Sequence, residues 1–173
     1  MEVGSWRLEI AELRTFQVRP LDQDDCEWVA RFLEEHWGST QIVSRGRSHD
    51  ASALPGFVAT QDDKPIGLIT YRIDGDQCEI VTIDSPMQGI GIGSALIDAV
   101  KDAAREAGCK RLWLITTNDN LPALRFYQKR GFVLAALYPN ALEQSRRLKP
   151  GISLVGIDGI PLRDEIELEM ILR

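Results

Sequence analysis

The strongest constraint on the fold is a strand–helix–strand unit in the middle of the chain. The sequence predicts an apolar strand over residues 77–84, a helix over 94–107 and a nearly continuous apolar strand over 111–117. Continuous apolar runs are typical of strands buried on both faces, and two strands joined through a helix pair in parallel. The unit therefore predicts a parallel strand pair inside a sheet that helices cover.

A glycine-rich turn connects the first strand of this unit to the helix. A helix N-terminus leaves backbone N–H groups without intrahelical partners, and its dipole favours negative charge. Glycine lets the backbone approach a bulky anion closely, so we expect a phosphate or pyrophosphate here. The turn reads Gln88-Gly89-Ile90-Gly91-Ile92-Gly93-Ser94.

Two common nucleotide-binding motifs fail on spacing. The dinucleotide fingerprint needs Gly-x-Gly-x-x-Gly followed by an acidic residue at the end of the next strand. Here the glycines fall at 89, 91 and 93, and no suitable acid ends the strand at 111–117. The P-loop needs a lysine after its last glycine, and none follows Gly93. The spacing that fits is Gln-x-x-Gly-x-Gly, which begins at Gln88.

A second motif lies downstream, at residues 120–132, and reads Asn-Leu-Pro-Ala-Leu-Arg-Phe-Tyr-Gln-Lys-Arg-Gly-Phe. Together with the glycine loop it resembles the GNAT superfamily of N-acetyltransferases, whose pattern Asn-x-x-Ala-x-x-x-Tyr-x-Lys-x-Gly-Phe it matches at every marked position. The two motifs stand in the expected order, and the resemblance covers roughly residues 15–138.

This resemblance implies an α+β fold with one domain over residues 1–173. The implied sheet is mixed, mostly antiparallel and seven-stranded, and helices flank it. It is splayed at a central parallel pair, between the strands that end at Asp84 and Thr117. Residues 1–13 are expected to form a tail or an extra strand.

The resemblance also implies acetyl-CoA as the co-substrate. The glycine loop would bind the pyrophosphate, and the strand ending at Ile83 would bond the pantetheine arm as if it were another strand. Gln88 would contact a phosphate or brace the loop. The implied coenzyme-binding residues are Ile83, Gln88, Gly89, Ile90, Gly91, Ile92, Gly93, Ser94, Asn120 and Lys129. Asn120 also suits the cap of a short helix.

Tyr127 is the candidate for stabilising the leaving group, because the resemblance places its hydroxyl near the coenzyme sulfur. A phenol with a pKa near 10 gives its proton to a thiolate near 8.5 at a cost of roughly 2 kcal/mol. Hydrogen-bond donation to the developing charge is therefore as plausible as full proton transfer. The alternative is a tyrosine whose ring packs under the coenzyme.

The amine acceptor must also lose a proton, and Glu79 and Asp84 are the candidate bases. A free alkylammonium resembles lysine, so reaching its neutral form near pH 7 costs roughly 4–5 kcal/mol. Side chains alternate along a strand, so the numbering places Glu79 and Asp84 on opposite faces and at most one in the site. The choice between them stays open.

The acceptor itself is expected to contact His36, Trp37 and Arg45, because the corresponding elements border the acceptor pocket in the family. Each residue also has a purely structural explanation: a histidine at a helix C-terminus, a core tryptophan and a solvated arginine. An arginine here suits an acceptor carboxylate or phosphate.

The composition limits the classes of molecule that the protein is expected to bind. The net charge is −6 and no Lys/Arg-rich run is present, which argues against nucleic acid and an anionic membrane. The first residues lack the apolar core of a signal peptide, and no apolar run reaches membrane-spanning length. Three scattered cysteines form no Cys-x-x-Cys pair, so we expect reduced packing residues, a cytoplasmic protein and no metal site.

Two further segments carry structural expectations. Residues 39–54 are polar and are expected to be irregular. Near the C-terminus, a strand over 152–157 is expected to pair with one over 166–172, in which Glu165, Glu167 and Glu169 face solvent.

The function that best fits is direct acetyl transfer from acetyl-CoA to a primary amine of a small molecule or peptide. No cysteine lies in the matching motifs, so a covalent acetyl-enzyme has no support. The main alternative is a non-catalytic acyl-CoA-binding module used for sensing or interaction. The resemblance makes a homodimer possible.

Overall fold

A mixed sheet of seven strands organises residues 15–173, the part of the chain that the structure, a computed structural model, describes. Its order is β1-β4-β5-β6-β7-β9-β8, and β2 and β3 form a separate hairpin. The strands are β1 (Gln17–Pro20), β2 (Gln41–Ser44), β3 (Arg47–Asp50), β4 (Gly56–Gln61), β5 (Lys64–Asp74), β6 (Gln77–Asp84), β7 (Arg111–Thr117), β8 (Val133–Tyr138) and β9 (Glu165–Ile171). The predicted mixed sheet is confirmed; the expectation for residues 1–13 lies outside the described residues.

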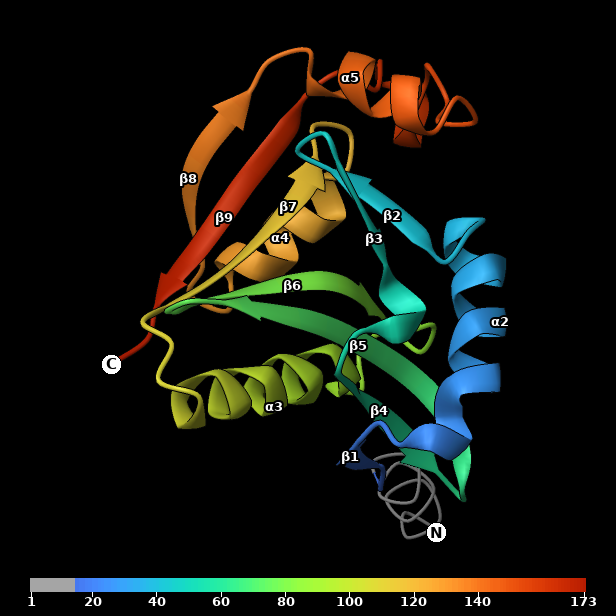
Figure 1. The fold of residues 1–173 in the computed structure, drawn as a ribbon, viewed down its shortest axis with the longest axis vertical. Coiled ribbons are helices and arrows are strands. Elements are labelled where there is room, and N and C mark those ends of the chain that lie inside the picture. The colour runs from blue at the N-terminus through green and yellow to red at the C-terminus, as the bar shows by residue number, and fades with distance from the viewer. Residues whose placement is uncertain (1–14) are drawn as a thin grey trace, which may run out of the picture.

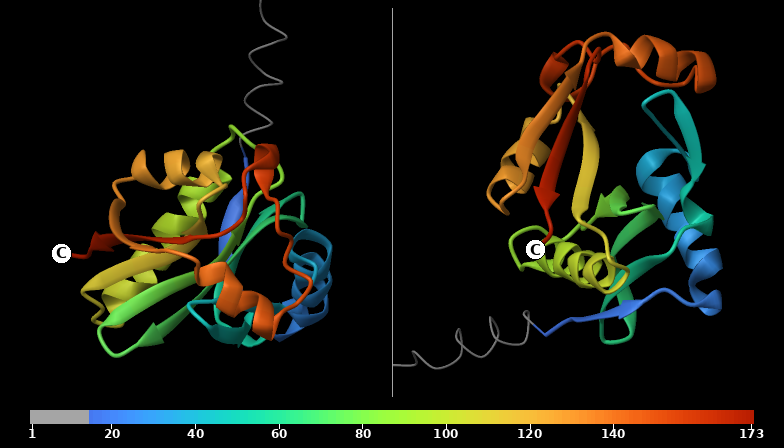
Figure 2. Two further views of the ribbon diagram at one scale, coloured as in Figure 1. Left: turned by 90° about the horizontal axis from the view of Figure 1, so that it is seen from above. Right: turned by 60° about the vertical axis from the view of Figure 1, so that its left-hand side comes forward.

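Helices cover both faces of this sheet (Figures 1 and 2). On one face, α3 and α4 pack on the central strands. On the other face lie α2, α5 and the β2–β3 hairpin. The helices are α2 (Cys26–Trp37), α3 (Ile92–Glu106), α4 (Leu121–Gln128) and α5 (Ala141–Leu148), with short 3₁₀ turns η1 (Gln23–Asp25), η2 (Ala51–Ala53) and η3 (Ile157–Gly159).

The parallel pair β6–β7 is joined only over the first half of each strand. The paired residues run from Gln77 with Arg111 to Ile80 with Leu114. Beyond that point the two strands diverge, as Figure 1 shows. The β6 backbone from Val81 to Asp84 therefore lacks a β7 partner, and the predicted splay is present.

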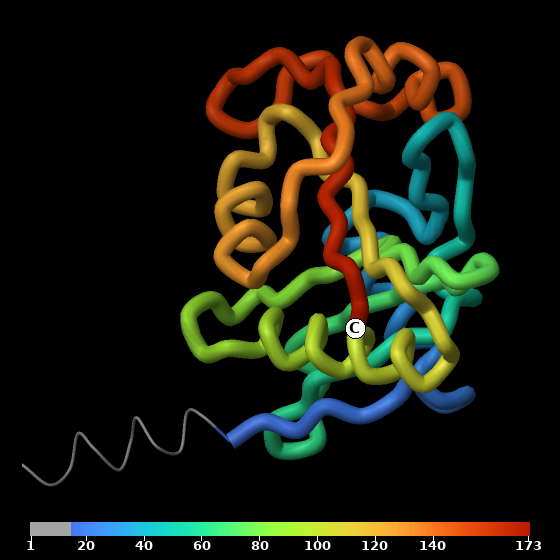
Figure 3. Tube along the Cα trace, turned by 90° about the vertical axis from the view of Figure 1, so that its left-hand side faces the viewer, coloured from blue at the N-terminus to red at the C-terminus, as the bar shows by residue number. Residues whose placement is uncertain are grey.

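Two apolar clusters hold the layers together. The larger lies between α3, α4 and the sheet, where α3 buries Ile92, Leu96, Ile97, Val100 and Ala104. The smaller joins α2 to the opposite face through Val29, Phe32 and Leu33, which meet Leu68 of β5. The tube in Figure 3, seen from the left-hand side of Figure 1, shows α3 and the C-terminal end of β9 nearest the viewer.

The expectation that residues 39–54 are irregular is wrong, because this segment forms the β2–β3 hairpin. Its two-residue turn places Arg45 and Gly46 at φ 50° and 65°. Turns with two positive φ values match the right-handed twist of the strands and usually use Asn-Gly or Asp-Gly. An Arg-Gly pair gives a weaker signal, which explains why the hairpin escaped prediction.

The predicted strand over 152–157 is also absent, and only an isolated bridge joins Val155 to Pro161. The backbone carbonyl groups of this segment accept hydrogen bonds from a side chain instead of from a neighbouring strand. The Arg146 guanidinium donates to the carbonyl oxygens of Ile152, Ser153 and Leu162. The segment is thereby an irregular loop fastened to α5.

Asp119 fastens the same loop to the end of β7, and Gly156 is the residue that permits it. The buried Asp119 carboxylate accepts from the Ile157 N–H at 2.9 Å. A Cβ at Gly156 would lie 2.0 Å from Asp119 Oδ2.

Gly156→Ala is therefore expected to lower the free energy of unfolding by about 2 kcal/mol in urea denaturation. Gly151→Ala is the control, since no atom lies within 4 Å of its added Cβ. Equal midpoints for the two variants would contradict this role of Gly156.

Candidate active site

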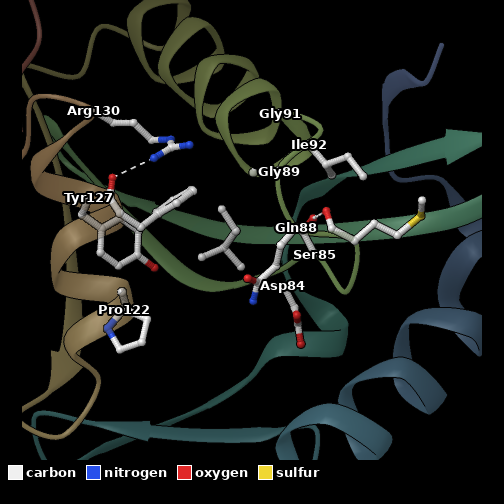
Figure 4. Close-up of a pocket in the computed structure, with 14 residues that line it drawn as sticks. Asp84, Ser85, Gln88, Gly89, Gly91, Ile92, Pro122, Tyr127 and Arg130 are labelled. Atoms are coloured by element: carbon white, nitrogen blue, oxygen red, sulfur yellow. Dashed lines mark hydrogen bonds between the residues drawn. The ribbon is translucent and has the colours of Figure 1, made fainter. Parts of the chain in front are cut away.

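The glycine loop forms one wall of a cavity of about 490 Å³ at the N-terminus of α3 (Figure 4). Gly89 and Gly91 have φ values of 84° and 89°, a region that glycine adopts without penalty. The first helical hydrogen bond runs from the Ala95 N–H to the Gly91 carbonyl at 3.0 Å. The three preceding N–H groups, from Ile92 to Ser94, therefore have no acceptor within the helix. The helix begins two residues earlier than predicted, at Ile92.

Most of the predicted coenzyme residues line this cavity. They are Ile83, Gln88, Gly89, Gly91, Ile92 and Gly93. Ile90 packs against the larger core cluster, and the Ser94 hydroxyl accepts from Arg130; neither residue is among those that line the cavity. Lys129 is exposed at the end of α4 and is not among the lining residues.

Arg130 is the basic residue that lines the cavity, and the sequence analysis missed it. Its Nε donates to Ser94 Oγ at 2.9 Å, and its Nη1 donates to the Phe126 carbonyl oxygen at 2.9 Å. The guanidinium also lies 3.5 Å above the centre of the Phe126 ring. Figure 4 shows Arg130 at the rim of the cavity. The available signal was a basic residue four positions after Phe126, just beyond the end of α4.

A second cavity, of about 320 Å³, opens where β6 and β7 diverge. Its lining includes six predicted site residues: His36, Trp37, Ile83, Asp84, Asn120 and Tyr127. Asn120 caps α4 by accepting the Ala123 N–H at 3.2 Å. The two cavities share Ile83, Asp84, Ala123 and Tyr127, so they meet at the splay.

Tyr127 stands between the two cavities. Its side chain is 8 % exposed, and its ring contacts Phe126 and Phe132 edge-on. Within residues 15–173 its hydroxyl makes no hydrogen bond shown by the structure, so it is available to a ligand. Burial raises the pKa of Tyr127 above its ordinary value, so the phenol stays protonated near neutral pH.

A β-bulge in β6 changes the predicted positions of the two candidate bases. Thr70 of β5 lies opposite Thr82, whereas Tyr71 lies opposite Ile80, which leaves Val81 as the extra residue. One extra residue reverses the alternation of side chains. Glu79 and Asp84 therefore lie on the same face, the one that α2 covers, and the expectation of opposite faces is wrong.

The two carboxylates have different partners. Glu79 is 4 % exposed and accepts from Arg72 Nε at 2.6 Å, in an ion pair. Asp84 is partly buried and forms no ion pair with the described residues. Burial raises the pKa of Asp84, and the nearby His36 and the Ser85 N–H partly oppose that shift.

His36 and Trp37 reach the second cavity from the last turn of α2. His36 Nδ1 lies 2.9 Å from the Phe32 carbonyl oxygen, and the imidazole stacks on the Phe32 ring. A carbonyl oxygen only accepts hydrogen bonds, so Nδ1 is the protonated nitrogen. Nε2 takes no part in this bond. The Trp37 side chain is 39 % exposed and lines the same cavity.

Arg45 lies apart from these two cavities. Its guanidinium pairs with Glu167 at 3.2 Å and stacks 3.3 Å above the centre of the Tyr138 ring. It thus stabilises the hairpin against β8 and β9. The expectation that Arg45 meets the acceptor has no contact in its favour.

The prediction that the β9 glutamates face solvent is wrong for Glu165 and Glu167, whereas Glu169 is partly exposed. Glu165 and Glu167 are 1 % and 7 % exposed, because the hairpin and α5 cover this face. Arg111 pairs with both Glu167 and Glu169. Burial of charged side chains needs such partners, and period-two spacing alone does not reveal them.

Within residues 15–173, no group of three or more histidine, cysteine, aspartate or glutamate side chains is arranged to hold a metal ion. In the same part of the chain, every helix is too short or too polar to span a bilayer. The expectations about metal, oligomeric state and cytoplasmic location stay predictions.

Comparison with known proteins agrees with this geometry. Residues 9–132 match the model of the acetyltransferase (GNAT) family. The uncharacterised protein YdhI of Bacillus subtilis is 47 % identical over 136 residues, which cover 78 % of this chain and 85 % of that protein. Streptothricin acetyltransferase of Streptomyces lavendulae is 44 % identical over 115 residues, covering 65 % of this chain and 61 % of that protein.

Among solved structures, a GNAT family acetyltransferase from Elizabethkingia anophelis with acetyl-CoA bound superimposes with a TM-score of 0.65. It covers 91 % of this chain and 98 % of its own, at 21 % identity, which shows a shared fold. The family model spans both the glycine loop and the segment around Tyr127. The chain therefore belongs to the acetyltransferase (GNAT) family.

Proposed function

We propose that this protein transfers an acetyl group from acetyl-CoA directly to a primary amine of a small molecule or peptide. The observation that carries the proposal is the meeting of the two cavities at Tyr127 and Asp84. One cavity offers unpaired N–H groups for an anion, and the other offers the Asp84 carboxylate for an amine. The reacting atoms would meet at the splay.

The first cavity fits the coenzyme by its donor groups. The N–H groups of Ile92, Gly93 and Ser94 point out of a helix N-terminus, where negative charge is favoured. Arg130 adds a positive charge on the same side. Beyond Ile80, the free edge of β6 offers backbone groups to an amide-containing arm. Acetyl-CoA bound to the Elizabethkingia relative supports this assignment.

A substitution at Gly91 tests whether the glycine loop binds the phosphate groups of the coenzyme. An L-residue in the left-handed region costs roughly 1–2 kcal/mol, so Gly91→Ala favours other loop conformations. Coenzyme binding would have to restore the loop, and the Kd for CoA in calorimetry is expected to rise about tenfold. Gly108→Ala is the matched control, because Gly108 ends the same helix region at φ 79° with no atom within 4 Å of an added Cβ. An equal loss of CoA affinity in both variants would count against the loop as the phosphate site.

Asp84 is our choice for the base. It is free of ion pairs among the described residues, lines both cavities and has a raised pKa, which brings a carboxylate closer to the range of an effective base. Glu79 is paired with Arg72 and lines neither of the two cavities that meet at the splay. We place Glu79 second.

Asp84 accepts one proton from the ammonium, the neutral nitrogen forms a bond to the acetyl carbon, and the carbon–sulfur bond breaks. The second proton of the nitrogen passes through solvent to the departing thiolate, so the products are the amide and the CoA thiol. The Tyr127 hydroxyl donates a hydrogen bond to the sulfur as it becomes negative. The raised pKa of Tyr127 favours this donation over full proton transfer. His36 and Trp37 would border the acceptor.

A screen for amine-dependent release of CoA tests the function. Purified protein and acetyl-CoA are incubated with amino acids, polyamines, aminoglycosides and short peptides, and the free thiol is measured. At least one class is expected to raise thiol release above the rate without acceptor. Tight acetyl-CoA binding without turnover of any class would instead support the non-catalytic module.

A further inference from the structure

Strands β6 and β9 place five carboxylates on the face of the sheet that carries Asp84, and three of the five have cationic partners. By register, Glu79 and Asp84 of β6 share this face with Glu165, Glu167 and Glu169 of β9. Arg72 pairs with Glu79, while Arg45 and Arg111 pair with Glu167, and Arg111 also pairs with Glu169. Among residues 15–173, no cationic side chain pairs with the other two, Asp84 and Glu165.

Glu165 needs a partner for its charge more than Asp84 does, because its side chain is only 1 % exposed. Among residues 15–173, its carboxylate accepts only from the Arg45 backbone N–H at 2.9 Å and the Ser145 hydroxyl at 3.3 Å. The Arg45 guanidinium itself turns to Glu167 and Tyr138. Burial raises the pKa of Glu165, and the nearby Glu79 adds to the shift. A buried carboxylate in this position is stabilised by a cation.

Glu165 is one of the residues that line a further cavity, of about 140 Å³. Glu79, Ser44 and Trp37 also line this cavity. It shares six lining residues with the cavity at the splay: Trp37, Ile80, Val81, Ile115, Thr116 and Asn120. The two spaces are thus neighbours, with Asp84 and Tyr127 at one end and Glu165 at the other.

We propose that the acceptor carries a second ammonium group, which Glu165 binds while the reacting amine lies beside Asp84 and Tyr127. The substrate class is then a diamine or polycationic amine. This inference rests on the proposed function. An indole and apolar side chains between the two acidic ends suit the hydrocarbon part of such a molecule. An acceptor with a carboxylate at this position would face like charge.

Matched amines separate this inference from general amine acetylation. We would measure kcat/KM for a series of linear α,ω-diaminoalkanes and for n-alkylamines of equal carbon number. At one chain length, the diamine is expected to exceed the monoamine by about 10- to 100-fold, the range for a hydrogen bond between charged groups. Glu165→Gln should remove this preference and leave the monoamine rate unchanged. Glu169→Gln is the control, because Glu169 shares the face but lines neither of these two cavities.

Two further measurements decide the case if Glu165→Gln fails to fold or turnover is absent. Glu165→Asp withdraws the carboxylate by one methylene and should move the preference to a longer diamine. Calorimetry of diamines with CoA-loaded protein should show binding that weakens in a folded Glu165 variant. No diamine preference at any length, or one unchanged by Glu165 variants, would overturn the inference. Absence of turnover with every amine would contradict the proposed function, and Glu165-dependent binding would still support the inference.

Discussion

Replacing Tyr127 by phenylalanine is expected to lower kcat by about 100-fold and to leave the Kd for acetyl-CoA nearly unchanged. The change removes only the hydroxyl, which makes no hydrogen bond shown among the described residues. The ring keeps its edge contacts with Phe126 and Phe132. The loss should therefore fall on the step in which negative charge develops on sulfur, because ground-state packing is preserved.

The control for Tyr127→Phe is Tyr71→Phe. Tyr71 belongs to the same core cluster and stacks on Phe57, and burial raises its pKa too, but it lines none of the cavities described above. Steady-state rates and calorimetry on both variants separate chemistry from packing. An unchanged kcat for Tyr127→Phe on a true acceptor would remove Tyr127 from the mechanism.

Asp84→Asn is expected to lower kcat/KM by about 100-fold and not to lower thermal stability. Asp84 has its pKa raised on folding, so its contribution to stability is full below the unfolded pKa and is lost as pH rises through the folded pKa. At neutral pH the ionised, partly buried carboxylate is therefore a destabilising group. Asparagine removes that charge and with it the proton acceptor.

The pH profile gives the sharper test of Asp84. Wild-type kcat/KM should fall as pH drops through the raised pKa of Asp84, because only the ionised carboxylate accepts a proton. The variant should lose that limb and keep only the dependence that the protonation of the amine imposes. Asp63→Asn, in the exposed β4–β5 turn, is the control. A variant profile that matches the wild type would return the role of base to Glu79 or water.

The sequence predicted the parts of the fold that local patterns specify. Apolar runs and glycine positions placed β6, β7 and α3 to within two residues, and the motifs identified the family. Gly38 ends α2 in the left-handed conformation, as a glycine after a helical pattern predicts. These features depend on neighbours along the chain.

What escaped prediction depends on contacts between distant residues. The bulge at Val81 has no local signature, yet it brings Glu79 and Asp84 to one face. The inward glutamates of β9 depend on Arg45 and Arg111, which come from the hairpin and β7. Alternation along a strand shows which residues share a face and does not show whether that face is covered. The sequence therefore did not predict that these carboxylates share one covered face of the sheet.

The fate of a labelled acetyl group tests whether the protein transfers it directly to the amine. Acetyl-CoA labelled in the acetyl carbons is incubated with protein and an active amine, and mass spectrometry follows the label in the amine and in the intact protein. Direct transfer predicts a labelled amide on the amine and an unlabelled protein at every time point. An amine that stays unlabelled, or label that accumulates on the protein before it reaches the amine, would contradict direct transfer.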